Sequence, residues 1–291
     1  MHRFFITPDQ LHGLIVRFDD DQAHQMRRVL RLRPGARVLA LDGEGLQYEV
    51  QLEEVTNSRV TGLVAAKTPA TGEPRVRLTL FQSLLQRDKF EWVLQKGTEI
   101  GVAAFVPVIT RRSLVREGDV GENKLVRWRR IIKEAAEQSG RGVLPAISAA
   151  VTLETALAGL PSPQPSPEGR GGAPSPHPSP EGRGGLVPSP FGGGLGRGSS
   201  PPARLALLAW EGETARTLRQ AVGQTNGVTD IVLFIGPEGG YETAEVEAAA
   251  AHGVVAFTLG RRVLRTETAA VVGAALVLYE LGEMGRSGEE R

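Results

Sequence analysis

The segment 231–240, IVLFIGPEGG, joins an apolar strand to a glycine-rich turn. Glycines at the carboxyl end of a parallel strand let a ligand approach the backbone, and α/β sheets bind their ligands at that edge. Pro237 stiffens the turn, and Glu238 places an acid at the tip of the strand. An ordinary tight turn is the alternative. Glu238 is the only turn residue with a side chain of any reach, which favours a ligand-binding loop.

The segment 259–270, LGRRVLRTETAA, leads from a strand into the final predicted helix. Thr266 can cap that helix, and Glu267 lies in its first turn, where an acid interacts favourably with the helix dipole. Arg261, Arg262 and Arg265 bring more positive charge than a connecting loop needs, which indicates a role beyond structure.

The final predicted helix, 266–281, is apolar on nearly every face. A helix without a polar side is buried in the core or in a subunit interface. Because the domain is small, this pattern predicts a homodimer contact.

Basic side chains are concentrated in two regions of a chain that is close to neutral, with 34 basic and 33 acidic residues. Residues 23–37 contain five arginines and no acid, and residues 111–141 contain nine basic and five acidic side chains. The predicted helix 88–100 carries Lys89, Trp92 and Lys96 on the face opposite its core stripe. Such local clusters predict contacts with phosphates, although surface charge for solubility is the alternative.

Composition excludes several classes of protein. The chain has no cysteine, so disulfides, a thiolate nucleophile, Cys-ligated zinc and iron–sulfur clusters are excluded. Five scattered histidines without an H-E-x-x-H motif argue against a zinc hydrolase, and we expect no metal site. The N-terminus lacks a signal peptide pattern, and the apolar stretch 269–279 is too short for a membrane span. We therefore expect a soluble cytoplasmic protein with no membrane partner.

The periodicity predicts two domains of different class. Residues 1–66 contain β-type runs at 3–6, 37–41, 48–55 and 59–66 and one helix-like stretch at 21–32, which predicts a small β-barrel or sheet. A breaker-rich linker spans 67–74. From residue 75 onward strands and helices alternate, which predicts an α/β domain with a mostly parallel sheet. Strands are expected at 76–84, 105–109, 204–209, 230–235 and 254–258, and helices at 88–100, 122–139, 213–222, 243–252 and 266–281.

A Pro/Gly-rich segment interrupts the second domain at 161–202. PSPQPSPEGRGG at 161–172 recurs as PSPHPSPEGRGG at 174–185, and a shorter copy follows. A sequence with so little to bury predicts a disordered surface insertion between a helix and a strand.

The two C-terminal motifs together resemble the RsmE-type family of SPOUT methyltransferases. Further matches are RFFI at the start, His24 with the RVLR of 28–31, LQKGTEIGV with a downstream Pro107, and RIIKEAAEQSGR with a downstream Pro145. The resemblance covers residues 1–160 and 203–283, and the insertion is not part of the family pattern.

The resemblance implies methylation of N3 of one uridine in 16S rRNA of the small ribosomal subunit, with S-adenosyl-L-methionine as the cofactor. It implies a PUA-like RNA-binding β-barrel at 1–68 and a SPOUT methyltransferase domain at 75–285. The SPOUT domain would end in a trefoil knot, an exception to the general rule that folds are not knotted. The family also implies a homodimer with its site near the interface.

The resemblance also assigns the site residues. Cofactor binding is expected from Leu208, Ala209, Glu211, Ile235, Gly236, Glu238, Gly239, Gly240, Leu259, Gly260, Val263 and Leu264. RNA contacts are expected from Arg3, His24, Arg28, Arg31, Arg87, Lys89, Lys96, Arg111, Lys133 and Arg141.

The expected chemistry assigns the catalytic residues. A cation beside O2 and O4 of uracil stabilises the charge that develops when N3 loses its proton, and Arg265 is the first candidate for that role. Glu238 or Glu267 could accept the proton.

Two other functions remain open. Another SPOUT reaction, such as 2′-O-ribose methylation of tRNA or rRNA, would share the fold and the cofactor. An RNA-binding protein without catalysis would need a degenerate cofactor loop, yet the expected glycines are present. A dinucleotide oxidoreductase lacks its phosphate-binding fingerprint.

Overall fold

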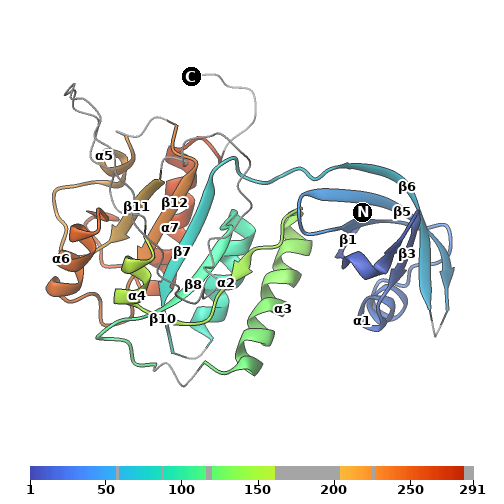
Figure 1. Cartoon of the computed structure of the whole chain (residues 1–291), viewed down its shortest axis with the longest axis horizontal. Coiled ribbons are helices and arrows are strands. Elements are labelled where there is room, and N and C mark those ends of the chain that lie inside the picture. Colours follow the sequence, from blue (N-terminus) through green and yellow to red (C-terminus); the bar gives the residue numbers. More distant parts are fainter. Residues whose placement is uncertain (57–58, 87, 116–119, 161–203, 224–226, 285–291) are drawn as a thin grey trace, which may run out of the picture.

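The structure is a computed structural model that describes residues 1–56, 59–86, 88–115, 120–160, 204–223 and 227–284 (Figure 1). The Pro/Gly-rich segment at 161–202 and the candidate RNA contact Arg87 lie outside the described residues. Two sheets carry the fold, one in each half of the molecule, and α3 lies between them (Figure 1).

The N-terminal half is a six-stranded sheet with the order β1-β4-β5-β6-β3-β2. Its strands are β1 (His2–Phe5), β2 (Leu11–His12), β3 (Ile15–Phe18), β4 (Arg37–Leu41), β5 (Leu46–Val55) and β6 (Val60–Pro69). β1 is parallel to β4, and the other neighbours are antiparallel. Between β3 and β4 lie α1 (Asp20–His24) and a π-helical turn (Gln25–Val29), and a 3₁₀ turn (Pro8–Gln10) precedes β2. The alternating strands bury one face around Phe4, Val16 and Met26.

The C-terminal half is a seven-stranded sheet with the order β10-β8-β7-β12-β11-β13, and β9 pairs with β8. Its strands are β7 (Arg77–Ser83), β8 (Ala104–Ile109), β9 (Ala146–Ile147), β10 (Val151–Thr152), β11 (Arg204–Ala209), β12 (Asp230–Ile235) and β13 (Val255–Phe257). All of its pairings are parallel, so the predicted α/β class with a parallel sheet is confirmed. The trefoil knot stays a prediction.

Helices cover both faces of the parallel sheet, because its central strands are apolar on both sides. In β12, Ile231, Leu233 and Ile235 pack into one core cluster, and Val232 and Phe234 pack into another. The helices on the first side are α2 (Lys89–Ile100), α3 (Glu122–Ser139), α5 (Leu218–Val222) and α7 (Thr266–Glu280). The helices on the second side are α4 (Leu153–Ala158) and α6 (Thr243–Ala251).

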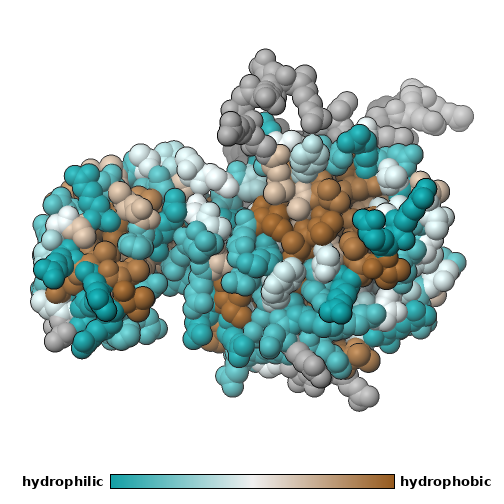
Figure 2. All heavy atoms as spheres, turned by 180° about the vertical axis from the view of Figure 1, so that it is seen from behind, coloured by the Kyte–Doolittle hydropathy of each residue, from teal (hydrophilic) through white to brown (hydrophobic). Residues whose placement is uncertain are grey.

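The final helix α7 is apolar on two sides but buried on only one. Ala270, Ala274 and Val277 are fully buried against the sheet, whereas Leu276 is 39% exposed and Tyr279 is 49% exposed. Figure 2 shows a hydrophobic region on this side of the C-terminal domain, over α7 and its neighbour α2. No helix in the described part of the chain is long and apolar enough to cross a membrane.

The two domains meet where the end of α3 approaches β1. The backbone N–H of Phe5 donates to Oε1 of Glu137 (3.0 Å), and Phe5 packs with Leu41 and Ala136. Burial raises the pKa of the Glu137 carboxyl, and the Phe5 N–H offsets part of that rise. These contacts fix the N-terminal sheet to the helix layer of the C-terminal domain.

Several predicted element boundaries need correction. Strands β2 and β3 were missed, because the run LHGLIVRF is short and is broken by Gly13. The predicted helix at 213–222 begins only at Leu218, where Thr217 caps it by accepting from the N–H of Gln220. The predicted capping role of Thr266 is also wrong, because Arg265 is the N-cap residue of α7 and Thr266 is its first helical residue.

Candidate functional site

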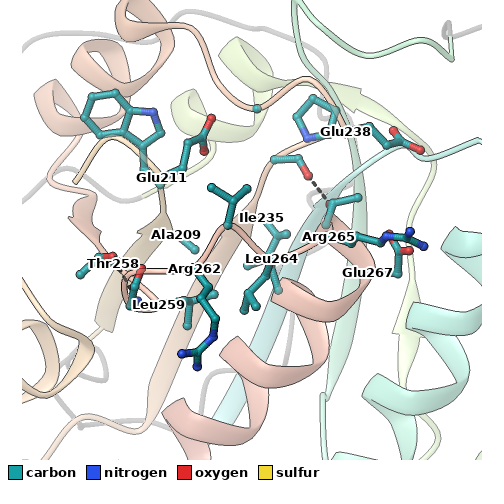
Figure 3. A pocket seen from close by; sticks show the side chains of 18 of the residues that line it. Ala209, Glu211, Ile235, Glu238, Thr258, Leu259, Arg262, Leu264, Arg265 and Glu267 are labelled. Carbon is teal, nitrogen blue, oxygen red and sulfur yellow. Dashed lines mark hydrogen bonds between the residues drawn. The ribbon is translucent and has the colours of Figure 1, made fainter. Parts of the chain in front are cut away.

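The carboxyl ends of β11, β12 and β13 lie side by side and create an open cavity. Ala209 is paired with Ile235 on one side and with Phe257 on the other, so the loops that follow these strands converge. The cavity between the loops has a volume of about 280 Å³ (Figure 3). Its position is the edge at which parallel α/β sheets bind ligands.

Most of the candidate cofactor residues line this cavity. They are Ala209, Glu211, Ile235, Gly236, Glu238, Gly240, Leu259, Gly260, Val263 and Leu264. The side chain of Leu208 points elsewhere, since it is fully buried in the core on the second side of the sheet. Gly239 is outside the lining too, and its carbonyl accepts from Nη1 of Arg112 (3.0 Å).

The residues assigned to cofactor binding are only part of the cavity wall. The additional lining residues are Lys89, Trp210, Pro237, Thr258, Arg261, Arg262, Thr266 and Ala269. Trp210, Pro237, Arg261 and Arg262 lie inside the three predicted cofactor loops, whereas Thr258, Thr266 and Ala269 lie beyond the ends of those loops. Lys89 was expected to contact RNA, and no local signal relates it to Glu238 in a turn that lies about 150 positions further along the chain.

Two glycines give the cavity its shape. Gly240 has a φ of +68°, and a Cβ there would lie 2.1 Å from Oε1 of Glu211. Gly260 has a φ of +111°, a conformation that residues with side chains rarely adopt. Backbone is therefore exposed to the cavity at both turns. This arrangement suits a small ligand that is recognised by main-chain groups.

The two candidate acids differ in what already occupies their oxygens. Oε1 of Glu238 is 3.1 Å from Nζ of Lys89 and accepts from the N–H of Gln86 (3.3 Å). Oε2 of Glu267 is buried and has no hydrogen-bond partner among the described residues. Glu267 thus retains a free acceptor at the cavity wall, whereas Glu238 is engaged by α2 and the loop before it.

Arg265 and Glu267 lie together at the start of α7, on the side of the cavity where Glu238 also lies (Figure 3). The side chains of Arg261, Arg262 and Arg265 are exposed, and none forms an ion pair within the described part of the chain. The cavity wall therefore combines uncommitted positive charge with an uncommitted buried carboxylate oxygen.

A hydrogen bond joins the turn after β12 to the start of α7 at the wall of the cavity. Oγ1 of Thr266 donates to the carbonyl of Gly236 (2.5 Å) (Figure 3). Nε2 of the buried Gln82 donates to Oγ1 of Thr266 (3.3 Å). The end of β7, the turn after β12 and the start of α7 are joined in this way.

Comparison with known proteins identifies the family. A model of the RNA methyltransferase domain matches residues 72–164 and 199–278, and a model of the RNA methyltransferase PUA domain matches residues 18–64. The ribosomal RNA small subunit methyltransferase E of Synechocystis is 30% identical, over 95% of this chain and 77% of that protein. The methyltransferase E of Bacillus subtilis is 27% identical, over 96% of this chain and 97% of that protein.

The chain belongs to the small-subunit rRNA methyltransferase E family. A crystal structure of the methyltransferase E from Neisseria gonorrhoeae, solved with S-adenosyl methionine bound, is 27% identical to it. That structure superposes with a TM-score of 0.72 and covers 96% of this chain and 97% of the other.

The methyltransferase has a second cavity in its PUA domain, lined mostly by arginines. Its residues are Arg27, Arg28, Arg31, Leu32, Arg33, Val55 and Thr56. His24 is exposed on α1 just before this cluster. The candidate RNA contacts Arg28 and Arg31 are thus brought together, and Arg31 adopts a φ of +53°.

The other candidate RNA contacts of the methyltransferase are dispersed. Lys96 pairs with Glu99 on α2 (2.8 Å), and Nη1 of Arg111 is 3.3 Å from Oε2 of Glu242. Lys133 on α3 and Arg3 on β1 are half-buried. Their role in RNA binding stays a prediction.

Arg141 of the methyltransferase requires a correction. Its side chain is only 4% exposed, and its guanidinium pairs with Glu73 in the interdomain linker (2.6 Å). Its Nη1 also donates to the carbonyls of Thr98 and Val102. A buried and fully engaged guanidinium cannot reach an RNA phosphate, so we assign Arg141 a structural role at the domain junction.

Proposed function

We propose that this protein methylates N3 of one uridine in the 16S rRNA of the small ribosomal subunit, with S-adenosylmethionine as the methyl donor. The observation that carries the proposal is the cavity at the ends of β11, β12 and β13, whose lining contains most of the residues expected to bind the cofactor. Support comes from the family match and from the Neisseria relative that was solved with S-adenosyl methionine.

The residues present fit this cofactor. Exposed backbone at Gly240 and Gly260 can bind polar groups of a nucleoside, and Ala209, Ile235 and Leu264 provide an apolar wall. When bound, S-adenosylmethionine supplies an activated methyl group, so the protein has to orient the attacking nitrogen and exclude water.

Arg265 is the residue that we assign to the developing negative charge. When uridine N3 loses its proton, charge spreads onto O2 and O4 of the base. The guanidinium of Arg265 is exposed at the cavity wall with no acidic partner among the described residues. Its charge is therefore available to stabilise these oxygens in the transition state.

Glu267 is the preferred proton acceptor of the two candidates. Its buried Oε2 has no partner in the described part of the chain, and it lies in the cavity wall beside Arg265. Glu238 is already hydrogen-bonded to Lys89 and to the backbone of Gln86, so we assign it a structural role at the rim.

The PUA domain supplies the main RNA contact. Arg27, Arg28, Arg31 and Arg33 gather around one open cavity, and such a cluster binds phosphates without reading sequence. Substrate RNA would extend from this arginine cluster to the methyl-transfer cavity. The reaction would take place in the cytoplasm, where ribosomes are assembled.

A homodimer is the proposed assembly. The outward face of α7 exposes Leu276 and Tyr279, and Val263 of the cavity loop is 85% exposed. Covering the exposed apolar side chains of α7 with a second copy would remove this surface from water (Figure 2).

The test is incubation of the purified protein with unmodified small subunits, or with free 16S rRNA, and labelled S-adenosylmethionine. Nucleoside mass spectrometry after digestion should find N3-methyluridine at one position. A 2′-O-methylated nucleoside would instead support the other SPOUT reaction, and no transfer to either substrate would contradict the proposal.

A further inference from the structure

A short relay of hydrogen bonds connects three segments of the C-terminal domain. Gln82 at the end of β7 donates through Nε2 to Oγ1 of Thr266 (3.3 Å) and to the carbonyl of Ser83 (3.0 Å). Thr266 at the start of α7 donates to the carbonyl of Gly236 (2.5 Å). A carbonyl can only accept, so the single hydroxyl proton of Thr266 is committed to Gly236 and its oxygen accepts from Gln82.

The relay is shielded from water. Gln82 is fully buried, and Thr266 is 8% exposed. A buried hydroxyl that lost its acceptor would remain desolvated without a partner, which makes this bond costly to break. The contact between α7 and the turn after β12 is therefore a fixed connection across 30 positions of the chain.

Helix capping does not explain the hydroxyl of Thr266. The N-cap position of α7 belongs to Arg265, which has extended backbone angles and makes no side-chain cap. A threonine hydroxyl more often bonds to backbone groups within a few positions of it in the chain. Here the hydroxyl is committed to a different segment, which indicates a role in joining that segment to α7.

Thr266 lies between Arg265 and Glu267, the two residues to which the proposed function assigns the chemistry. Its partner Gly236 is the first residue of the turn that lines the cofactor cavity. One side chain thus links the cofactor turn to the segment that carries the catalytic residues.

We propose that Thr266 is a positioning residue that couples the cofactor turn at 236–240 to the placement of Arg265 and Glu267, with Gln82 orienting its hydroxyl. The inference rests on the proposed function. A displacement of about 1 Å in a reacting group can cost about 100-fold in rate. Loss of the relay should therefore affect turnover more than cofactor affinity.

The experiment compares Thr266→Val, Thr266→Ser and the neighbouring Thr268→Val in the full-length chain. Thr266→Val removes the hydroxyl at nearly constant shape, Thr266→Ser keeps it, and Thr268 is a matched control outside the cavity lining. Calorimetry gives the dissociation constant for S-adenosylmethionine, and methyl transfer at saturating substrates gives kcat.

We expect Thr266→Val to lower kcat at least about 10-fold while the cofactor dissociation constant changes less than about 3-fold. Thr266→Ser should restore most of kcat, and Thr268→Val should match the wild type. Equal values for Thr266→Val and Thr268→Val would overturn the inference. So would a parallel loss of affinity and kcat, or a failure of serine to rescue.

Two further measurements keep the test decisive. If the thermal melting profile shows that Thr266→Val does not fold, Gln82→Leu interrupts the same relay one bond earlier and should also lower kcat.

If the wild type fails to methylate uridine, the proposed function fails, and hydrogen exchange then tests the coupling between the cofactor turn and α7. Cofactor should slow amide exchange at 267–270, beyond the expected cofactor residues, in wild type and Thr266→Ser but not in Thr266→Val. Equal protection in all three would overturn the inference.

Discussion

The proposed chemistry depends most on the positive charge of one side chain, Arg265. Arg265→Ala should lower kcat by roughly 100-fold, because stabilisation of the uracil oxygens is needed only as N3 loses its proton. Cofactor affinity should change little, and Arg265→Lys should retain part of the rate. Single-turnover methyl transfer and calorimetry measure both quantities. Full turnover of Arg265→Ala would remove this residue from the mechanism.

Glu267 and Glu238 both line the cavity, but we expect only the loss of the Glu267 carboxylate to slow methyl transfer strongly. Glu267→Gln removes the acceptor whose Oε2 has no partner in the described part of the chain, and kcat should fall by about 100-fold. Glu238→Gln alters an oxygen that Lys89 and Gln86 already engage, so kcat should change much less. Rates measured at saturating cofactor and RNA decide between them. The reverse order of the two effects would exchange their assigned roles.

Residues of the site were predictable where the chain keeps them together. Gly236, Gly240 and Leu264 belong to motifs that follow strands of one parallel sheet, so sequence order alone brings them to one edge. Lys89 and Arg141 were not predictable, because an ion pair with Glu238 or with Glu73 depends on tertiary packing. A basic residue in a sequence looks the same whether it binds RNA or a buried carboxylate.

At the scale of the element, α7 was predictable in extent but not in its details. Its apolar run fixed the range at 266–280 to within one residue, whereas the hydroxyl of Thr266 turned out to bond a distant carbonyl. Strands β2 and β3 escaped prediction because short segments are determined by their neighbours in the sheet.

The exposed apolar face of α7 is the surface through which we expect the protein to self-associate. Leu276→Glu places a charge in the apolar region beside Tyr279 and should weaken self-association at least about 10-fold. Leu14→Glu is the matched control, because Leu14 is 63% exposed in the N-terminal domain. Sedimentation velocity over a range of concentrations measures the association. A Leu276→Glu protein that sediments as the wild-type dimer would locate the interface elsewhere.

In the whole molecule, the pair of Glu73 and Arg141 holds the interdomain linker against the C-terminal domain. Burial raises the pKa of Glu73, but the hydrogen bond and charge of Arg141 and the N–H groups of Val143 and Gly142 outweigh burial and leave the pKa below its ordinary value. A lowered carboxyl pKa stabilises the folded state above the unfolded pKa, and this contribution is lost as pH falls through the folded pKa.

Glu73→Gln should therefore reduce the free energy of unfolding by about 3 kcal/mol at neutral pH, because it leaves a buried guanidinium without its counter-charge. The difference from wild type should shrink as the pH falls and the Glu73 carboxyl of the wild type becomes protonated. Urea unfolding at several pH values measures both effects. A difference that is constant with pH would mean that the ionised pair does not stabilise the junction.

The loops after β11, β12 and β13 form the pocket that we assign to S-adenosylmethionine. Calorimetric titration of the cofactor into wild type and Ala209→Phe tests it most directly, because a phenylalanine at this lining position occupies the cavity. We expect one cofactor per chain in the wild type and at least about 10-fold weaker binding in the variant at unchanged thermal stability. Absence of binding to the wild type, or equal affinity of both proteins, would contradict it.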